Sequence, residues 1–152
     1  MLNSSSLKLA IITSEFNRSI TDRLYHSAIE QCQVLNITLD EQDVTWVPGA
    51  VEIPLIAQQY ARKGYYHAII CLGSVIRGET SHYDYVCQQV SEGCQKVSLA
   101  HNIPVIFGVL TTEDKAQALA RSGGAHSDKG RESVVAAVEM ATIMQRFKRI
   151  YA

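Results

Sequence analysis

The chain has 152 residues, of which 47% are hydrophobic and 19% are charged, and its formal net charge is −1 at pH 7. A chain of this length buries about 68–70% of its unfolded surface, so we expect one globular domain over residues 1–152, with residues 1–7 as a short polar arm. The near-neutral charge argues against a nucleic-acid partner and against binding to an anionic membrane surface. No apolar run in the sequence approaches the ~18 residues of a membrane span.

Strands and helices are predicted to alternate along the whole chain. Strands are predicted from short apolar runs, and helices from apolar residues that recur at helical spacing. In chain order, the predicted elements are a strand at 8–13, a helix at 20–35, a strand at 43–47, a helix at 51–62, a strand at 67–72, a helix from about 82 to 102, a strand at 104–110, a short helix ending at 121 and a last helix at 129–147.

This order of elements predicts the fold class. Four strands separated by helical crossovers form a parallel sheet that helices cover on both faces. Because such crossovers are right-handed, we expect an α/β protein with a flavodoxin-like three-layer α/β/α sandwich and a four-stranded parallel sheet.

The four cysteines are predicted to be reduced. Cys87 and Cys94 are seven residues apart on one predicted helix, which separates them by about 10 Å at ~1.5 Å per residue. A disulfide needs Cα atoms within roughly 7 Å, so this pair cannot bridge. With Cys32 and Cys71 on apolar stretches, all four are expected to be small core or near-core residues of a cytoplasmic protein.

The strand-to-helix loops are predicted to form a small-molecule site, because ligands of open α/β sheets bind outside the carboxyl ends of the strands. The first loop presents Phe16, which either stacks on a flat heterocycle or packs back onto the core. The second presents Ala50, Val51 and Glu52 at the start of a helix. Glu52 either accepts hydrogen bonds from a polyol or amine, or only complements the helix dipole.

The third loop and the last two helices supply candidates for proton transfer and anion binding. His82 lies at the first turn of the long helix, where the helix dipole disfavours the protonated imidazole, so it can accept a proton near neutral pH. The alternative is an ordinary surface or capping histidine.

Arg121 and Lys129 are the strongest candidates for anion binding, and the alternative for Arg121 is a solvated helix end. No spacing of His, Cys, Asp and Glu suggests a metal site.

Several sequence motifs, taken together, carry a family resemblance. They are SEFN (14–17), VPGAVEIP (47–54), GSVIRGETSHYDYV (73–86), PVIFGVLTTE (104–113), the segment 121–130 and AAVEMA (136–141). Each motif is weak alone, but together and in this order they are highly specific. Over essentially its whole length the chain resembles the 6,7-dimethyl-8-ribityllumazine synthase family of riboflavin biosynthesis.

The resemblance implies a transferase activity with no metal or organic cofactor. In that reaction, 5-amino-6-(D-ribitylamino)uracil condenses with 3,4-dihydroxy-2-butanone 4-phosphate to give 6,7-dimethyl-8-ribityllumazine and inorganic phosphate. The implied steps are imine formation, elimination of phosphate, and ring closure with loss of water.

The resemblance also implies a role for each candidate residue. Phe16 would stack on the pyrimidine, Ala50, Val51 and Glu52 would contact the ribityl chain, and His82 would transfer protons. The uracil pocket would be lined by Ser74, Val75 and Ile76, while Glu79 and Thr80 would hold the butanone phosphate. Phe107 and Arg121 would reach in from a neighbouring subunit, with Arg121 on the phosphate and Lys129 assisting it more weakly.

A site shared between subunits implies a homopentamer at least. A decamer and a sixty-subunit shell both stay open, because the loop at 123–128 departs from the Gly-Thr-Lys-x-Gly-Asn pattern of many members. A riboflavin synthase would be a further partner. The alternatives are a non-catalytic flavin- or lumazine-binding module, a shell-forming protein on the same scaffold, and an archaeal-type riboflavin synthase.

Overall fold

A parallel four-stranded sheet forms the centre of the molecule, which a computed structural model describes over residues 3–151, with side chains described through residue 148. The strands are β1 (Leu9–Ser14), β2 (Val44–Val47), β3 (Ala68–Ile76) and β4 (Val105–Thr112). They lie in the order β2-β1-β3-β4 and every neighbouring pair is parallel. The predicted parallel sheet is confirmed.

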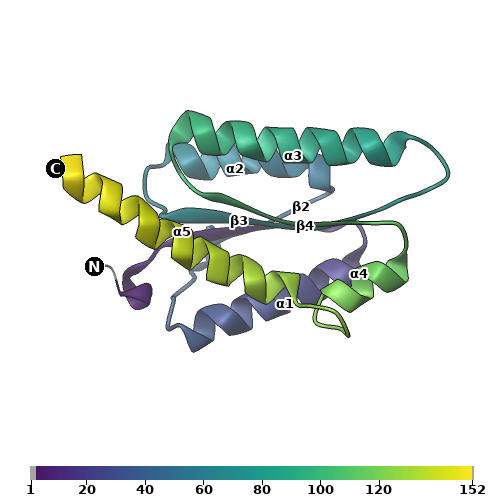
Figure 1. The fold of residues 1–152 in the computed structure, drawn as a ribbon, viewed down its shortest axis with the longest axis horizontal. Helices are drawn as coiled ribbons and strands as arrows, with labels where there is room; N and C mark the ends of the chain where they lie inside the picture. The colour runs from purple at the N-terminus through teal and green to yellow at the C-terminus, as the bar shows by residue number, and fades with distance from the viewer. Residues whose placement is uncertain (1–2, 152) are drawn as a thin grey trace.

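Helices cover both faces of this sheet, so the predicted three-layer architecture is also confirmed. Figure 1 shows α2 and α3 over one face, and α1, α4 and α5 over the other. Their bounds are α1 (Arg18–Val34), α2 (Ile53–Arg62), α3 (His82–His101), α4 (Lys115–Arg121) and α5 (Lys129–Tyr151). Short 3₁₀ turns are η1 (Ser4–Ser6), η2 (Glu41–Asp43) and η3 (Ala50–Glu52). No described helix is both long and apolar enough to cross a membrane.

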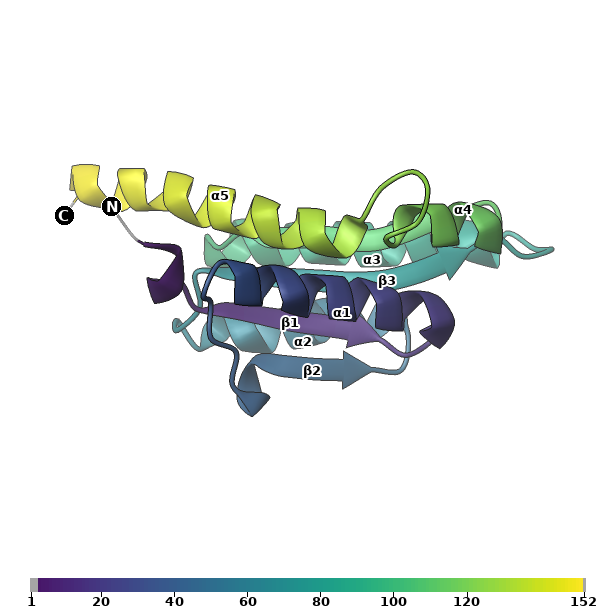
Figure 2. The same ribbon diagram turned by 90° about the horizontal axis from the view of Figure 1, so that it is seen from below.

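The two central strands divide their side chains between two apolar clusters, because successive residues of a strand point to opposite faces. Ile12 and Ile69 pack under α2 and α3. Ile11 and Ile70 pack against α1 and α5 on the other face. Figure 2 shows the strand arrows pointing to the same end of the molecule. The loops that follow the strands therefore gather at that end, which we call the carboxyl edge; the opposite end is the amino edge.

Most predicted element boundaries differ slightly from the observed ones, and one difference concerns the site. The segment 73–76 was predicted to be loop, but it extends β3, because β4 continues to pair with it through Val75–Thr111 and Ile76–Thr112. Gly73 serves close packing there, since a Cβ on it would lie 2.9 Å from the Ser14 Oγ. The connecting loop is therefore shorter than expected and spans residues 77–81.

The remaining boundary corrections are small. The second helix begins two residues late because residues 50–52 form a 3₁₀ turn first. The other observed spans are 9–14, 18–34, 44–47, 82–101, 105–112 and 129–151. All four cysteines are free, and Cys32, Cys71 and Cys94 are buried, in agreement with the prediction.

Candidate functional site

A cavity of about 430 Å³ opens at the carboxyl edge. This volume lies within the range of small-molecule sites, which is roughly 300–1,000 Å³. Its walls come from the loop after β1, the turn after β2, the end of β3 with its following loop, and the first two turns of α3. The prediction that these loops share one edge of the sheet is confirmed.

Most of the candidate residues line this cavity. From the predicted set, they are Phe16, Ala50, Val51, Glu52, Ser74, Val75, Ile76, Thr80 and His82. Six further residues line the cavity without a predicted role, and they are Asn17, Pro48, Gly49, Gly78, Tyr83 and Val86.

Backbone and side-chain hydrogen bonds hold Phe16 at the cavity mouth. The Phe16 N–H donates to the Pro48 carbonyl oxygen at 3.0 Å. The next residue, Asn17, has a left-handed backbone with φ of 62°, and its Nδ2 donates to the Ser74 carbonyl oxygen at 2.8 Å. The Phe16 side chain is 71% exposed, so the alternative that it packs back onto the core is wrong. Asparagine tolerates this backbone better than most residues, so an asparagine at the end of the strand-to-helix loop is the signal that could have identified position 17.

The second wall is the tight turn that follows β2. Gly49 has an extended backbone before the 3₁₀ turn Ala50–Glu52, and the Glu52 N–H donates to its carbonyl oxygen at 3.2 Å. A Cβ on Gly49 would lie 3.0 Å from Oε2 of Glu52. The Glu52 carboxylate therefore folds back over this turn, on the wall of the cavity.

Buried hydroxyl groups lie near the carboxyl ends of the two central strands. Among the described residues, the buried side-chain oxygens without a protein hydrogen-bond partner belong to Thr13, Ser14, Thr21 and Ser74. Thr13 and Ser14 end β1, Ser74 lies near the end of β3, and Thr21 is in the first turns of α1. All of them are therefore at the carboxyl edge. Polar atoms left unpaired in a folded protein carry a free-energy cost and are common at functional sites.

His82 is the first residue of α3, and it is exposed to the cavity. Its backbone N–H donates to the Thr80 Oγ1 at 3.3 Å. Val86 follows four residues later and lines the same cavity. This spacing places both side chains on one face of the helix. Helical periodicity is therefore the signal that could have identified Val86 as a lining residue. Burial raises the pKa of Tyr83, the residue beside His82.

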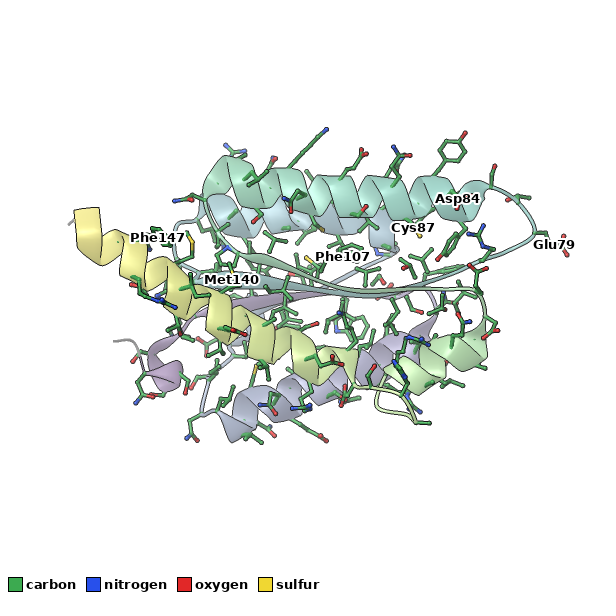
Figure 3. The ribbon with its side chains drawn as sticks, in the orientation of Figure 1. Glu79, Asp84, Cys87, Phe107, Met140 and Phe147 are labelled. Atoms are coloured by element: carbon green, nitrogen blue, oxygen red, sulfur yellow. The ribbon has the colours of Figure 1, made fainter. Side chains whose placement is uncertain are left out.

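The other candidate residues do not line the cavity of this chain. Figure 3 shows Glu79 at the outer tip of the loop before α3, and Phe107 between the sheet and α3. Phe107 belongs to the edge strand β4 and is half-buried. Arg121 ends α4, where its Nη1 donates to the Gln117 carbonyl oxygen at 3.3 Å. Lys129 begins α5. The helices that carry them, α4 and α5, cover the face of the sheet opposite α2 and α3 (Figure 1).

Comparison with known proteins places the chain in a family. A family model described as 6,7-dimethyl-8-ribityllumazine synthase matches residues 6–145. The chain belongs to this family. A protein of the same name from Coxiella burnetii (strain Dugway 5J108-111) is 50% identical over 147 residues, which cover 97% of both chains. Its counterpart from strain RSA 493 / Nine Mile phase I is 49% identical over the same share.

The lumazine synthase motifs divide spatially into two sets. The segments 14–17, 47–54 and 73–86 supply every residue that lines the cavity. The segments 104–113, 121–130 and 136–141 contribute no residue to it. Among the described residues, no group of three or more His, Cys, Asp or Glu side chains is arranged to hold a metal ion.

Proposed function

We propose that the chain catalyses the lumazine synthase reaction, the condensation of 5-amino-6-(D-ribitylamino)uracil with 3,4-dihydroxy-2-butanone 4-phosphate. The observation that carries the proposal is the cavity itself. In a member of this family, it combines an exposed aromatic ring, a carboxylate on a tight turn and a histidine at a helix N-terminus. The product is 6,7-dimethyl-8-ribityllumazine, and inorganic phosphate leaves.

The cavity walls match the two ends of the uracil substrate. The Phe16 ring stacks on the flat pyrimidine, because it lines the cavity and most of its surface is exposed to a ligand. The pyrimidine edge meets the end of β3 at Ser74, Val75 and Ile76. Glu52, with Ala50 and Val51 beside it, accepts hydrogen bonds from the ribityl hydroxyl groups.

His82 relays protons in the three steps of the condensation. The amine of the uracil substrate attacks the ketone of the second substrate, and loss of water gives an imine. A proton is then removed from carbon while the phosphate leaves, and ring closure expels a second water. Each step moves a proton at the mouth of the cavity, where His82 is exposed. A positioned general acid–base group of this kind contributes typically 10²–10⁴-fold.

The departing phosphate needs a cation, and the cavity of one chain has no lysine or arginine among its described lining residues. We propose that Arg121 of a neighbouring chain supplies it, with Lys129 assisting and Phe107 closing the pocket. Glu79 and Thr80 hold the same substrate from the other side. This arrangement requires a head-to-tail ring of identical subunits, and we propose a pentamer as the smallest assembly.

The whole chain then acts as one catalytic unit in the cytoplasm, where its free thiols stay reduced. A riboflavin synthase is the partner that would consume its product.

The test is to mix both substrates with the purified protein and follow lumazine absorbance. Product should form with wild-type protein, and Arg121→Ala should slow it by about a hundred- to a thousandfold, as for loss of an oxyanion-stabilising donor. Folded wild-type protein that forms no lumazine would contradict the proposal. Lumazine supplied alone is the control, since its consumption would indicate a riboflavin synthase instead.

A further inference from the structure

Arg77 is the first residue of the loop between β3 and α3, and its side chain contacts three residues in two other segments, the first turn of α3 and the end of β4. Its Nε donates to Oε2 of Glu113 at 2.7 Å, just after the end of β4. Its Nη2 donates to Oδ1 of Asp84 at 3.4 Å, in the first turn of α3. Its guanidinium carbon lies 4.3 Å from the centre of the Tyr83 ring. The backbone N–H of Arg77 donates to the Thr112 carbonyl oxygen at 2.9 Å.

His82 itself makes none of these contacts, but the two residues that follow it do. Tyr83 and Asp84 directly follow His82, and both are held by Arg77. Tyr83 lines the cavity, whereas Arg77 does not, so the guanidinium supports that wall from outside. Figure 3 shows Asp84 at the start of α3, set back from the exposed tip at Glu79.

Stability alone does not explain this cluster. The side chains of Arg77, Asp84 and Glu113 are 39%, 61% and 60% exposed, and ion pairs between exposed groups contribute little to folding. The pairs join positions 36 and 7 residues apart in the chain, so they fix one segment relative to another. A planar guanidinium suits this task because it stacks on a ring and directs donors to two carboxylates at once.

We propose that Arg77 is a positioning residue for His82, holding the first turn of α3 against the end of β4. The proposal rests on the proton-transfer role given to His82 under the proposed function. Displacing a catalytic group by about 1 Å can slow a reaction by about a hundredfold. Arg77 thus acts on the rate of the chemical steps more than on substrate binding.

Steady-state kinetics with both substrates test the proposal in wild-type and His82→Ala backgrounds. Arg77→Met keeps most of the aliphatic stem and removes the charge, and it should lower kcat about ten- to a hundredfold, with a much smaller change in KM. In the His82→Ala background the same substitution should have almost no further effect, because the group it positions is gone. Arg77→Lys, which keeps the charge, should restore part of the rate.

The matched control is Arg18→Met. Arg18 also pairs with two carboxylates, at 2.8 Å to Asp22 and 3.9 Å to Glu15, and its guanidinium lies 4.0 Å from the Trp46 ring centre. Its ion pairs are local to the start of α1, so this variant should keep the wild-type rate.

Hydrogen exchange gives a readout independent of catalysis. The Asp84 and Tyr85 amides donate to the Ser81 carbonyl oxygen at 3.0 and 3.4 Å, and they should exchange faster in Arg77→Met than in wild type. Unchanged exchange, or an equal loss of rate in both backgrounds, would overturn the positioning role. A wild-type rate in His82→Ala alone would instead overturn the proton-transfer role. In that case, faster exchange in Arg77→Met would still show that Arg77 holds the first turn of α3.

Discussion

The buried polar groups at the two edges of the sheet differ in whether they have hydrogen-bond partners within the protein. At the amino edge, the buried Asp43 carboxylate is fully engaged, since Oδ1 accepts from the Tyr66 hydroxyl at 2.7 Å and Oδ2 from the Asp40 N–H at 2.8 Å. His67 there accepts from the Lys8 N–H at 2.9 Å. At the carboxyl edge, buried hydroxyls lack protein partners and an aromatic ring stands exposed.

This difference indicates that the amino edge of the sheet contributes mainly to stability and the carboxyl edge mainly to ligand binding. Paired buried groups hold the strands and helices together, because each broken pair leaves an unsolvated polar atom. Unpaired groups and exposed rings are available to a ligand instead. Substitutions at the amino edge should therefore change the free energy of unfolding, and those at the carboxyl edge should change turnover.

The largest expected effect comes from dividing the proposed site between two chains. His82→Ala and Arg121→Ala should each be strongly impaired, by about 10²-fold or more. Unfolding and refolding them together at equal amounts should restore about a quarter of the wild-type rate, since a head-to-tail ring then contains intact His82–Arg121 pairs at some interfaces. The measurement is lumazine formation before and after mixing.

Mixing two portions of the same variant is the control for this experiment, and it should restore nothing. If the mixture also stays as slow as its components while the chains assemble normally, His82 of one chain and Arg121 of its neighbour do not meet in one site. The carboxyl edge would then be complete within a single chain.

The second effect should appear at the amino edge and leave turnover unchanged. Tyr66→Phe removes the hydroxyl that donates to Asp43, which is only 2% exposed. Losing a hydrogen bond to a buried charged group should lower the free energy of unfolding by about 1.5–3 kcal/mol. Denaturant titration measures the change. Tyr65→Phe, at an adjacent ring that is 47% exposed, should change it by less than about 0.5 kcal/mol. An equal loss of unfolding free energy in both variants would show that the paired Asp43 carboxylate does not stabilise the amino edge.

The third effect is again on turnover. Phe16→Leu keeps an apolar side chain at the cavity mouth but removes the ring, and stacking is worth about 0.5–1.5 kcal/mol beyond buried area. KM for the uracil substrate should therefore rise about two- to twelvefold, while the unfolding midpoint stays within the error of the measurement. Phe16→Tyr, which keeps the ring, should retain the wild-type KM. A large loss of stability in Phe16→Leu would instead place this ring among the packed residues.

Much of this contrast can be predicted from the sequence, because the decisive patterns are local. The apolar runs of β1 and β3 predict strands buried on both faces, and the carboxyl edge follows from their parallel order. Phe16 and His82 stand out since each follows a strand in a polar setting. The resemblance of the motifs to the family is the source of the roles proposed for both residues.

Other features depend on contacts between segments that are far apart in the chain, and local sequence patterns do not predict such contacts. Gly73 and Ser74 resemble a loop, but β4 extends the ladder over them. Arg77 is anchored by Glu113, 36 residues further along the chain. Glu79 is in the same motif as His82, yet it lies at the loop tip outside the cavity (Figure 3). The contact that we propose for Arg121 lies between chains, and local patterns in one chain do not specify such a contact.

The smallest expected effect is a pH dependence at the amino edge. Burial, with further contributions from Lys148 and Lys8, lowers the pKa of His67 below its usual 6.5. The unfolded chain therefore takes up a proton at higher pH than the folded one. The stability that neutral His67 contributes is complete above about pH 6.5 and is lost as the pH falls toward its folded-state pKa. Protonation would also remove the acceptor for the Lys8 N–H.

Denaturant titrations of wild type and His67→Gln between about pH 5 and 7 measure this dependence. The free energy of unfolding of wild type should fall more steeply toward low pH than that of the variant. His126→Gln, in the exposed loop after α4, should keep the wild-type slope. Identical slopes in wild type and His67→Gln would show that the proton is taken up equally by folded and unfolded chains. In that case the pairing of His67 with Lys8 would add nothing to the contrast between the two edges.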